Sequence, residues 1–133
     1  MEKISRDEIK VRGIGRVLKS FKYSLEGLKY AYKYEQSMSI HVVFTVIAIV
    51  IGFVLKINLV DWAIIFIALG TILGMELINT SIEAMVDLVT LEKNQLAKIA
   101  KDCGSAATFV LSLVAAVACL IVYAPHFIEF FNL

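Results

Sequence analysis

The sequence is poor in residues that break helices and in those that cross-link small secreted domains. Its 133 residues include one Pro, seven Gly and two Cys, and charged residues make up 19%. So little Pro and Gly excludes a disordered chain, a collagen-like chain and a loop-rich all-β fold. Hydrophobic residues make up 59%, above the roughly 45–50% of an ordinary soluble domain. The composition predicts a single all-α membrane domain over residues 1–133.

Motifs of soluble enzymes and metal sites are also missing. The sequence has no Walker-type or kinase-type glycine-rich loop, no Cys/His metal spacing and no serine nucleophile elbow. Cys103 and Cys119 lie sixteen positions apart, about 24 Å along a helix, so we interpret them as core residues and not as a disulfide. His41 and His126 are too isolated to bind a metal. Nothing in the pattern favours nucleic-acid binding.

Three apolar stretches are long enough to cross a bilayer, which takes about 20 apolar residues. The predicted spans are 37–56, 62–88 and 103–124, and the second extends into the cytoplasm. Twelve of the thirteen Lys and Arg residues precede the first span or lie between the second and the third. The positive-inside rule therefore predicts a bacterial cell-membrane protein with its N-terminus in the cytoplasm and its C-terminus outside.

The segment 16–36, before the first span, has one apolar face and one basic face. Its apolar residues fall within a stripe about 80° wide, at 100° per residue. We expect a cytoplasmic helix that lies in the membrane interface, because the sequence offers no soluble core on which it could pack. Residues 1–15 are expected to form a flexible tail.

The acidic end of the second span, residues 76–87, is the most informative stretch. At helical spacing Glu76, Glu83 and Asp87 lie within about 40° of one another, with Asn79 on the same side. We place Glu76 about 9 Å below the cytoplasmic surface, Glu83 close to it and Asp87 outside. Carboxylates in a membrane are costly, and a divalent cation or a shared proton would relieve their repulsion. Hydrogen bonds that join helices of an oligomer are the alternative.

Three more charged residues should lie at the same interface as Glu83. Glu35 ends the surface helix, and Lys101 and Asp102 precede the third span. Lys101 is a natural partner for polyphosphate. The alternatives are a solvated helix-end charge for Glu35 and a positive-inside anchor for Lys101. Small residues at 104–107 would let another helix approach closely.

These motifs resemble those of the prokaryotic diacylglycerol kinase family, small three-span lipid kinases unrelated to soluble kinases. The resemblance covers residues 16–123. It is carried by Glu-x-x-Asn-(Ser/Thr)-x-Ile-Glu-x-x-x-Asp at 76–87, by Ala-Lys-Asp at 100–102 and by Gly-Ser-Ala-Ala at 104–107. It implies a homotrimer whose active sites lie at the membrane surface and combine residues of neighbouring protomers. It also implies that ATP and Mg²⁺ serve to phosphorylate a lipid alcohol.

The resemblance further implies a role for each matching residue. Glu76 would be the general base that meets the lipid hydroxyl, and Ser105 would face the lipid. Glu35 and Glu83 would bind the Mg²⁺ that holds ATP, with polar support from Asn79 and Asp87. The nucleotide contacts would come from Arg16, Tyr23, Lys101 and Asp102.

The family has an undecaprenol branch and a diacylglycerol branch. The span-entry segment 35–41 ends in His41, as in the undecaprenol branch, where the other branch carries glutamate. The continuation Asp-Leu-Val-Thr at 87–90 also resembles the undecaprenol branch, so we predict undecaprenol as substrate and diacylglycerol as the alternative. Gln36 and Ser37 replace a more usual Arg-Asn pair, which weakens any lipid or nucleotide role for them. The 92–95 segment replaces a loop that commonly bears histidine.

Two functions of other classes remain open on the residues alone. A small oligomeric cation- or proton-coupled transporter would bind its ion at Glu76, near the bilayer centre. A non-catalytic membrane anchor or holin-like protein would leave the acidic stretch without a purpose. The rise of the acids toward the cytoplasmic face favours the kinase.

Overall fold

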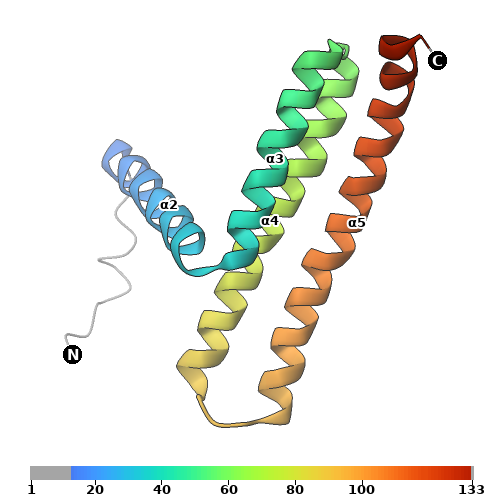
Figure 1. Cartoon of the computed structure of the whole chain (residues 1–133). Helices are drawn as coiled ribbons and strands as arrows, with labels where there is room; N and C mark the ends of the chain where they lie inside the picture. The colour runs from blue at the N-terminus through green and yellow to red at the C-terminus, as the bar shows by residue number, and fades with distance from the viewer. Residues whose placement is uncertain (1–12, 133) are drawn as a thin grey trace.

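Four helices make up the part of the chain that the structure describes, residues 13–132 of a computed structural model. They are α2 (Ile14–Tyr34), α3 (Gln36–Leu55), α4 (Leu59–Val89) and α5 (Gln95–Phe131). Figure 1 shows α3, α4 and α5 side by side in one bundle, with α2 directed away from it. Because α3, α4 and α5 are each long and apolar enough to cross a membrane, they confirm the predicted all-α fold with three such helices.

The two ends of the bundle differ in what joins the helices. At one end, here called the turn end, residues 56–58 connect α3 to α4. At the other, the loop end, residues 90–94 connect α4 to α5. Figure 1 shows α4 and α5 continuing toward the loop end past the junction of α2 and α3. This extension carries the polar residues of both helices beyond the level at which α3 begins.

Local sequence explains where the helices begin. The Asn58 side chain accepts hydrogen bonds from the backbone N–H groups of Val60 and Asp61, at 2.8 and 3.0 Å. Asn94 caps α5 in the same way through Leu96 and Ala97. These caps satisfy N–H groups that have no partner within the helix.

The helix α5 is longer than the predicted span 103–124. It begins eight residues earlier, at Gln95, because the Asn94 cap allows the polar residues before the apolar run to join the helix. It also continues through Pro125 to Phe131. One proline removes one backbone hydrogen bond, and the flanking turns remain helical. Hydropathy delimits the apolar run and not the helix.

The surface segment predicted at 16–36 forms α2, which begins at Ile14 and ends at Tyr34. Of the predicted tail 1–15, residues 1–12 lie outside the described residues. Glu35 separates α2 from α3 with an extended backbone, φ −102° and ψ 113°. The chain therefore changes direction at Glu35, and α2 leaves the bundle there.

The buried core lies toward the turn end. It is formed by Ala48, Ile57, Ile65, Leu69, Val122 and Tyr123. The Tyr123 hydroxyl donates a 2.8 Å hydrogen bond to the carbonyl oxygen of Ala48, which ties α5 to α3. The His126 ring nitrogen lies 2.9 Å from the Asp61 carboxylate and ties α5 to α4.

A glycine of α3 allows close packing in this core. Trp62 lies over Gly52, and its ring contacts Phe53 at a centroid distance of 4.9 Å. A Cβ atom at Gly52 would lie 2.8 Å from the Trp62 ring and 3.1 Å from Ile57 Cδ1. The turn between α3 and α4 thus depends on the absence of a side chain at this position.

We expect Gly52→Val to destabilise the bundle by about 1–3 kcal/mol, because the added methyl groups overlap Trp62 and force the core to move. Thermal unfolding in a mild detergent, followed by circular dichroism, measures the effect. Gly70→Val is the control, since a Cβ at Gly70 meets nothing within 4 Å in this chain. An equal loss of melting temperature in both variants would contradict the prediction.

Candidate active site

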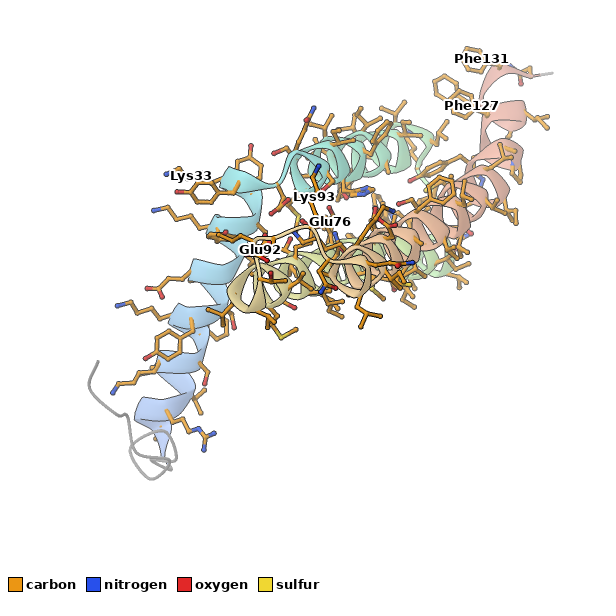
Figure 2. All side chains as sticks on the ribbon, turned by 90° about the horizontal axis from the view of Figure 1, so that it is seen from below. Lys33, Glu76, Glu92, Lys93, Phe127 and Phe131 are labelled. Carbon is orange, nitrogen blue, oxygen red and sulfur yellow. The ribbon has the colours of Figure 1, made fainter. Side chains whose placement is uncertain are left out.

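Glu76 is the most deeply buried charged residue in the described part of the chain. It lies on α4 with 1% of its surface exposed, although it carries a carboxylate. The Ser37 hydroxyl, from the first turn of α3, donates a hydrogen bond to Glu76 Oε1. The Thr80 hydroxyl donates to the backbone carbonyl of Glu76 at 3.0 Å. Figure 2 views the molecule from below and places Glu76 between α3 and α4.

Asn79 and Glu83 form a second polar pair, one helical turn nearer the loop end. The Asn79 amide donates a 3.0 Å hydrogen bond to Glu83 Oε1. Asn79 is 8% exposed, and its carbonyl Oδ1 is buried without a hydrogen-bond partner. That oxygen lies so close to Gly104 on α5 that a Cβ there would overlap it. Gly104 therefore lets α5 pack against Asn79, and the predicted close approach at 104–107 is made at this residue.

Lys101 and Asp87 join α5 to α4 near the loop end. Their side chains form an ion pair of 2.6 Å. Lys98 and Asp102 form a second ion pair one turn apart on α5. These four residues border a polar cavity of about 280 Å³ that also includes Thr90 and Asn94. The cavity presents both ammonium groups and carboxylates to a solute.

The charged residues around Glu76 act on one another. Burial raises the pKa of Glu35, and the negative charges of Glu83 and then Glu76 raise it further. Lys101 lowers the pKa of Glu35 by a smaller amount. Glu35, Glu76, Glu83 and Lys101 thus form one electrostatic cluster, which we call the acidic cluster. Three carboxylates with one neighbouring cation favour the binding of further positive charge.

The acidic cluster suits a cation that needs few protein ligands. Among residues 13–132 no group of three or more His, Cys, Asp and Glu side chains could hold a metal ion. Magnesium in a nucleotide site commonly takes one or two carboxylates and completes its shell with phosphate oxygens and water. The oxygen donors of Glu35 and Glu83 fit that requirement, and the repulsion at Glu35 is what a divalent ion would relieve.

Three of the predicted site residues lie apart from the acidic cluster within one chain. Arg16 and Tyr23 are exposed on α2, which points away from the bundle in Figure 1. Ser105 is also exposed, although it follows buried Gly104. A single chain therefore brings together Glu35, Glu76 and Glu83 but leaves these three residues on its surface.

One contact of the site was missed by the sequence reasoning. Because Ser37 replaces the residue that is usual in the family at this position, the sequence argued against a lipid or nucleotide role for it. Its hydroxyl nevertheless donates a hydrogen bond to the buried Glu76 carboxylate. The available signal was helical spacing, which places Ser37 on the same side of its helix as His41. It did not show that α4 would lie against that side.

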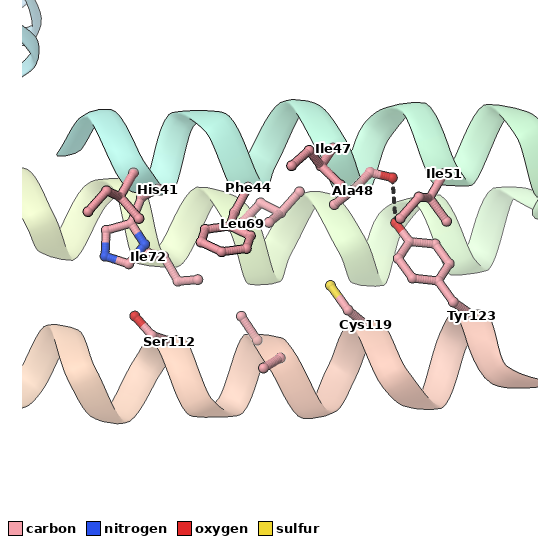
Figure 3. Close-up of a pocket in the computed structure, with 13 residues that line it drawn as sticks. His41, Phe44, Ile47, Ala48, Ile51, Leu69, Ile72, Ser112, Cys119 and Tyr123 are labelled. Atoms are coloured by element: carbon pink, nitrogen blue, oxygen red, sulfur yellow. Dashed lines mark hydrogen bonds between the residues drawn. The ribbon is translucent and has the colours of Figure 1, made fainter. Parts of the chain in front are cut away.

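An apolar cavity of about 460 Å³ runs between α3, α4 and α5. It is lined by His41, Phe44, Leu69, Ile72, Ser112 and Tyr123, among others. Figure 3 shows its length, with His41 and Ser112 toward one end and Tyr123, bonded to Ala48, at the other. The His41 end lies one helical turn from the Ser37–Glu76 pair, because His41 follows Ser37 by four residues.

Comparison with known proteins relates this chain to one family of lipid kinases. The sequence pattern of the family described as prokaryotic diacylglycerol kinase matches residues 22–123. Undecaprenol kinase from Bacillus subtilis is 30% identical over 112 residues, which cover 84% of this chain and 91% of that protein. Diacylglycerol kinase from Pseudomonas aeruginosa is 39% identical over 98 residues, or 74% and 80% of the two chains. Diacylglycerol kinase from Escherichia coli K12 is 30% identical over 115 residues, or 86% and 94%.

The matched region contains the whole acidic cluster. It includes Glu35, Glu76, Glu83 and Lys101, together with α3, α4 and the part of α5 up to Tyr123. Family membership implies ATP-dependent transfer of a phosphoryl group to a lipid, and it favours neither a transporter nor a non-catalytic anchor. The chain belongs to the prokaryotic diacylglycerol kinase family and is a membrane lipid kinase.

Proposed function

We propose that this lipid kinase transfers the γ-phosphoryl group of ATP to undecaprenol and forms undecaprenyl phosphate. The observation that carries the proposal is the position of Glu76, a member of the acidic cluster that is buried one turn from the end of an apolar cavity. His41 lines that cavity, and the Bacillus subtilis relative is named undecaprenol kinase. Because other relatives are named diacylglycerol kinases, diacylglycerol is the alternative substrate.

The proposed topology puts the loop end in the cytoplasm. The bias of Lys and Arg supports it, since Lys93, Lys98 and Lys101 all lie at or near the loop end. The N-terminus is then cytoplasmic and the C-terminus outside. The helix α2 would lie in the membrane interface with its basic face toward water. ATP reaches the site from the cytoplasm, and the lipid arrives sideways through the bilayer.

Glu76 is proposed as the general base. Its carboxylate accepts the proton of the lipid hydroxyl while the hydroxyl oxygen forms a bond to the γ-phosphorus of ATP. The bond between that phosphorus and the bridging oxygen of ADP breaks, and ADP leaves with the electron pair. The products are a lipid monophosphate and ADP, and the proton remains on Glu76 until water removes it.

Positioning and charge neutralisation supply most of the catalysis in phosphoryl transfer. Glu35 and Glu83 would hold Mg²⁺, which when bound would neutralise phosphate charge. Asn79 orients Glu83 through its amide, and Asp87 holds Lys101 at the cavity near the loop end. Lys101 and Asp102 would contact the nucleotide there.

A homotrimer would complete the site. Arg16, Tyr23 and Ser105 lie on the surface of one chain, where a neighbouring copy can use them. The proposal places Arg16 and Tyr23 on the nucleotide and Ser105 on the lipid of such a shared site. Large exposed apolar side chains on every helix, such as Phe44, Phe66 and Phe109, are compatible with contact to lipid or to another copy.

Purified protein incubated with labelled ATP and Mg²⁺ should phosphorylate undecaprenol with a higher kcat/KM than diacylglycerol. The two lipids are supplied in separate vesicles of otherwise equal composition, and the labelled lipid products are separated by chromatography. A higher kcat/KM for diacylglycerol would establish the alternative substrate. Failure to label either lipid would contradict the proposal as a whole.

Replacing the proposed base should remove turnover and leave the fold intact. We expect Glu76→Gln to lower kcat by about 10²–10⁴-fold, the usual contribution of a positioned base. Glutamine keeps the size of the side chain and can still accept a hydrogen bond from Ser37. Glu26→Gln, on the exposed face of α2, is the control and should behave as the parent protein. Normal lipid phosphorylation by Glu76→Gln would show that another group removes the proton.

Loss of a proposed magnesium ligand should change the metal requirement. We expect Glu83→Gln to raise the Mg²⁺ concentration needed for half-maximal activity, because one charged oxygen donor is lost. A magnesium titration at saturating ATP measures this. Glu129→Gln serves as the matched control, because Glu129 lies in the last turns of α5, at the end of that helix far from Lys101. An unchanged titration for Glu83→Gln would count against its role as a ligand.

A further inference from the structure

We propose that Ser37 is a positioning residue that orients the Glu76 carboxylate for proton transfer. The proposal rests on the proposed role of Glu76 as the base. Ser37 lies in the first turn of α3 and Glu76 lies on α4, thirty-nine positions away in sequence. Their side chains meet in a hydrogen bond from the Ser37 hydroxyl to Glu76 Oε1.

The carboxylate of Glu76 needs a hydrogen-bond donor where it lies. With 1% of its surface exposed, it is out of contact with bulk water, and a buried carboxylate without a donor is strongly unfavourable. Among the described residues, Ser37 is the donor that the carboxylate has. The Thr80 hydroxyl bonds the backbone of Glu76 instead. Thr80 therefore stabilises the helix at this point, whereas Ser37 acts on the side chain.

A single donor from another helix determines the direction of a flexible side chain. Glutamate has three side-chain torsions, and the terminal one is broad, so the helix alone does not orient the carboxylate. The bond from α3 restricts those torsions and aims one oxygen at Ser37. Proton abstraction requires the base within hydrogen-bond reach of the hydroxyl, which a side chain free to rotate meets less often.

The position of the pair fits this role. His41 follows Ser37 by one turn on α3, and Ile72 precedes Glu76 by one turn on α4, and both line the apolar cavity shown in Figure 3. Ser37 and Glu76 therefore flank the same end of that cavity. Ser37 also lies two residues after Glu35 of the acidic cluster. One short segment at the start of α3 thus contacts the proposed base and carries a proposed magnesium ligand.

Loss of the Ser37 hydroxyl removes the donor of a buried carboxylate and so costs some stability, and the kinetic readouts of the test separate positioning from folding. Ser37 is itself exposed, so a change to alanine removes the hydroxyl and leaves the packing of the bundle unchanged. Ser39 offers a matched control two residues further on. Its hydroxyl donates to the backbone carbonyl of Tyr32 at 3.3 Å and does not contact Glu76.

The test compares the steady-state kinetics of Ser37→Ala, Ser37→Thr and Ser39→Ala in the full chain, with undecaprenol and ATP–Mg²⁺ as substrates. We expect Ser37→Ala to lower kcat about tenfold, the effect of one lost hydrogen bond of about 1.4 kcal/mol. The KM for ATP–Mg²⁺ should stay unchanged, because the proposed role gives Ser37 no contact with the nucleotide. Threonine keeps a hydroxyl and should restore kcat to within about threefold. Ser39→Ala should match the parent protein.

Several outcomes would overturn the proposal. They are a parental kcat in Ser37→Ala, a threonine variant as slow as the alanine variant, a parallel rise in the KM for ATP–Mg²⁺, or an equal loss in Ser39→Ala. Glu76→Gln is assayed in the same series to separate the two claims. If Glu76→Gln is inactive and Ser37→Ala is normal, only the role of Ser37 fails. If Glu76→Gln is active, the proposed base itself is wrong.

Discussion

The burial of one carboxylate constrains the rest of this structure. A glutamate that is almost fully enclosed by apolar helices is costly unless a donor or a cation compensates its charge. Ser37 provides the donor from α3, which requires α3 to begin beside this turn of α4. The extended backbone at Glu35 provides that start, because it ends α2 and lets the chain change direction. The turn before α3 thus determines which residue meets the Glu76 carboxylate of α4.

The pair of helices α4 and α5 forms the platform for the polar part of the site. Gly104 allows α5 to approach Asn79, whose amide then holds Glu83. Nearer the loop end, the Lys101–Asp87 ion pair joins the same two helices. Because both helices extend past the start of α3 (Figure 1), charged residues gather at one end while the apolar cavity lies alongside the helices. This separation would suit a reaction between an aqueous nucleotide and a membrane lipid.

The single chain leaves part of the proposed site on its surface. Arg16 and Tyr23 are exposed on α2, and Ser105 is exposed on α5. The proposed site, with one fixed part and one part contributed by a neighbouring copy, would account for this arrangement. The fixed part would hold the base and the metal, which need tight geometry. The contributed part would meet the nucleotide and the lipid, which must enter and leave.

Local sequence patterns predict the number of apolar spans, the acidic face of the second span and the gathering of Glu35, Glu76 and Glu83 in one region. Hydropathy and helical periodicity report such features because they are local. Only the folded chain shows that Ser37 meets Glu76, that Gly104 makes room for Asn79, that α5 begins at Gln95 and that α2 leaves the bundle. The first two depend on which face of one helix packs against another helix, and no pattern within a single helix contains that information. The departure of α2 depends on the extended backbone at Glu35. The early start of α5 depends on a side-chain cap that hydropathy does not measure.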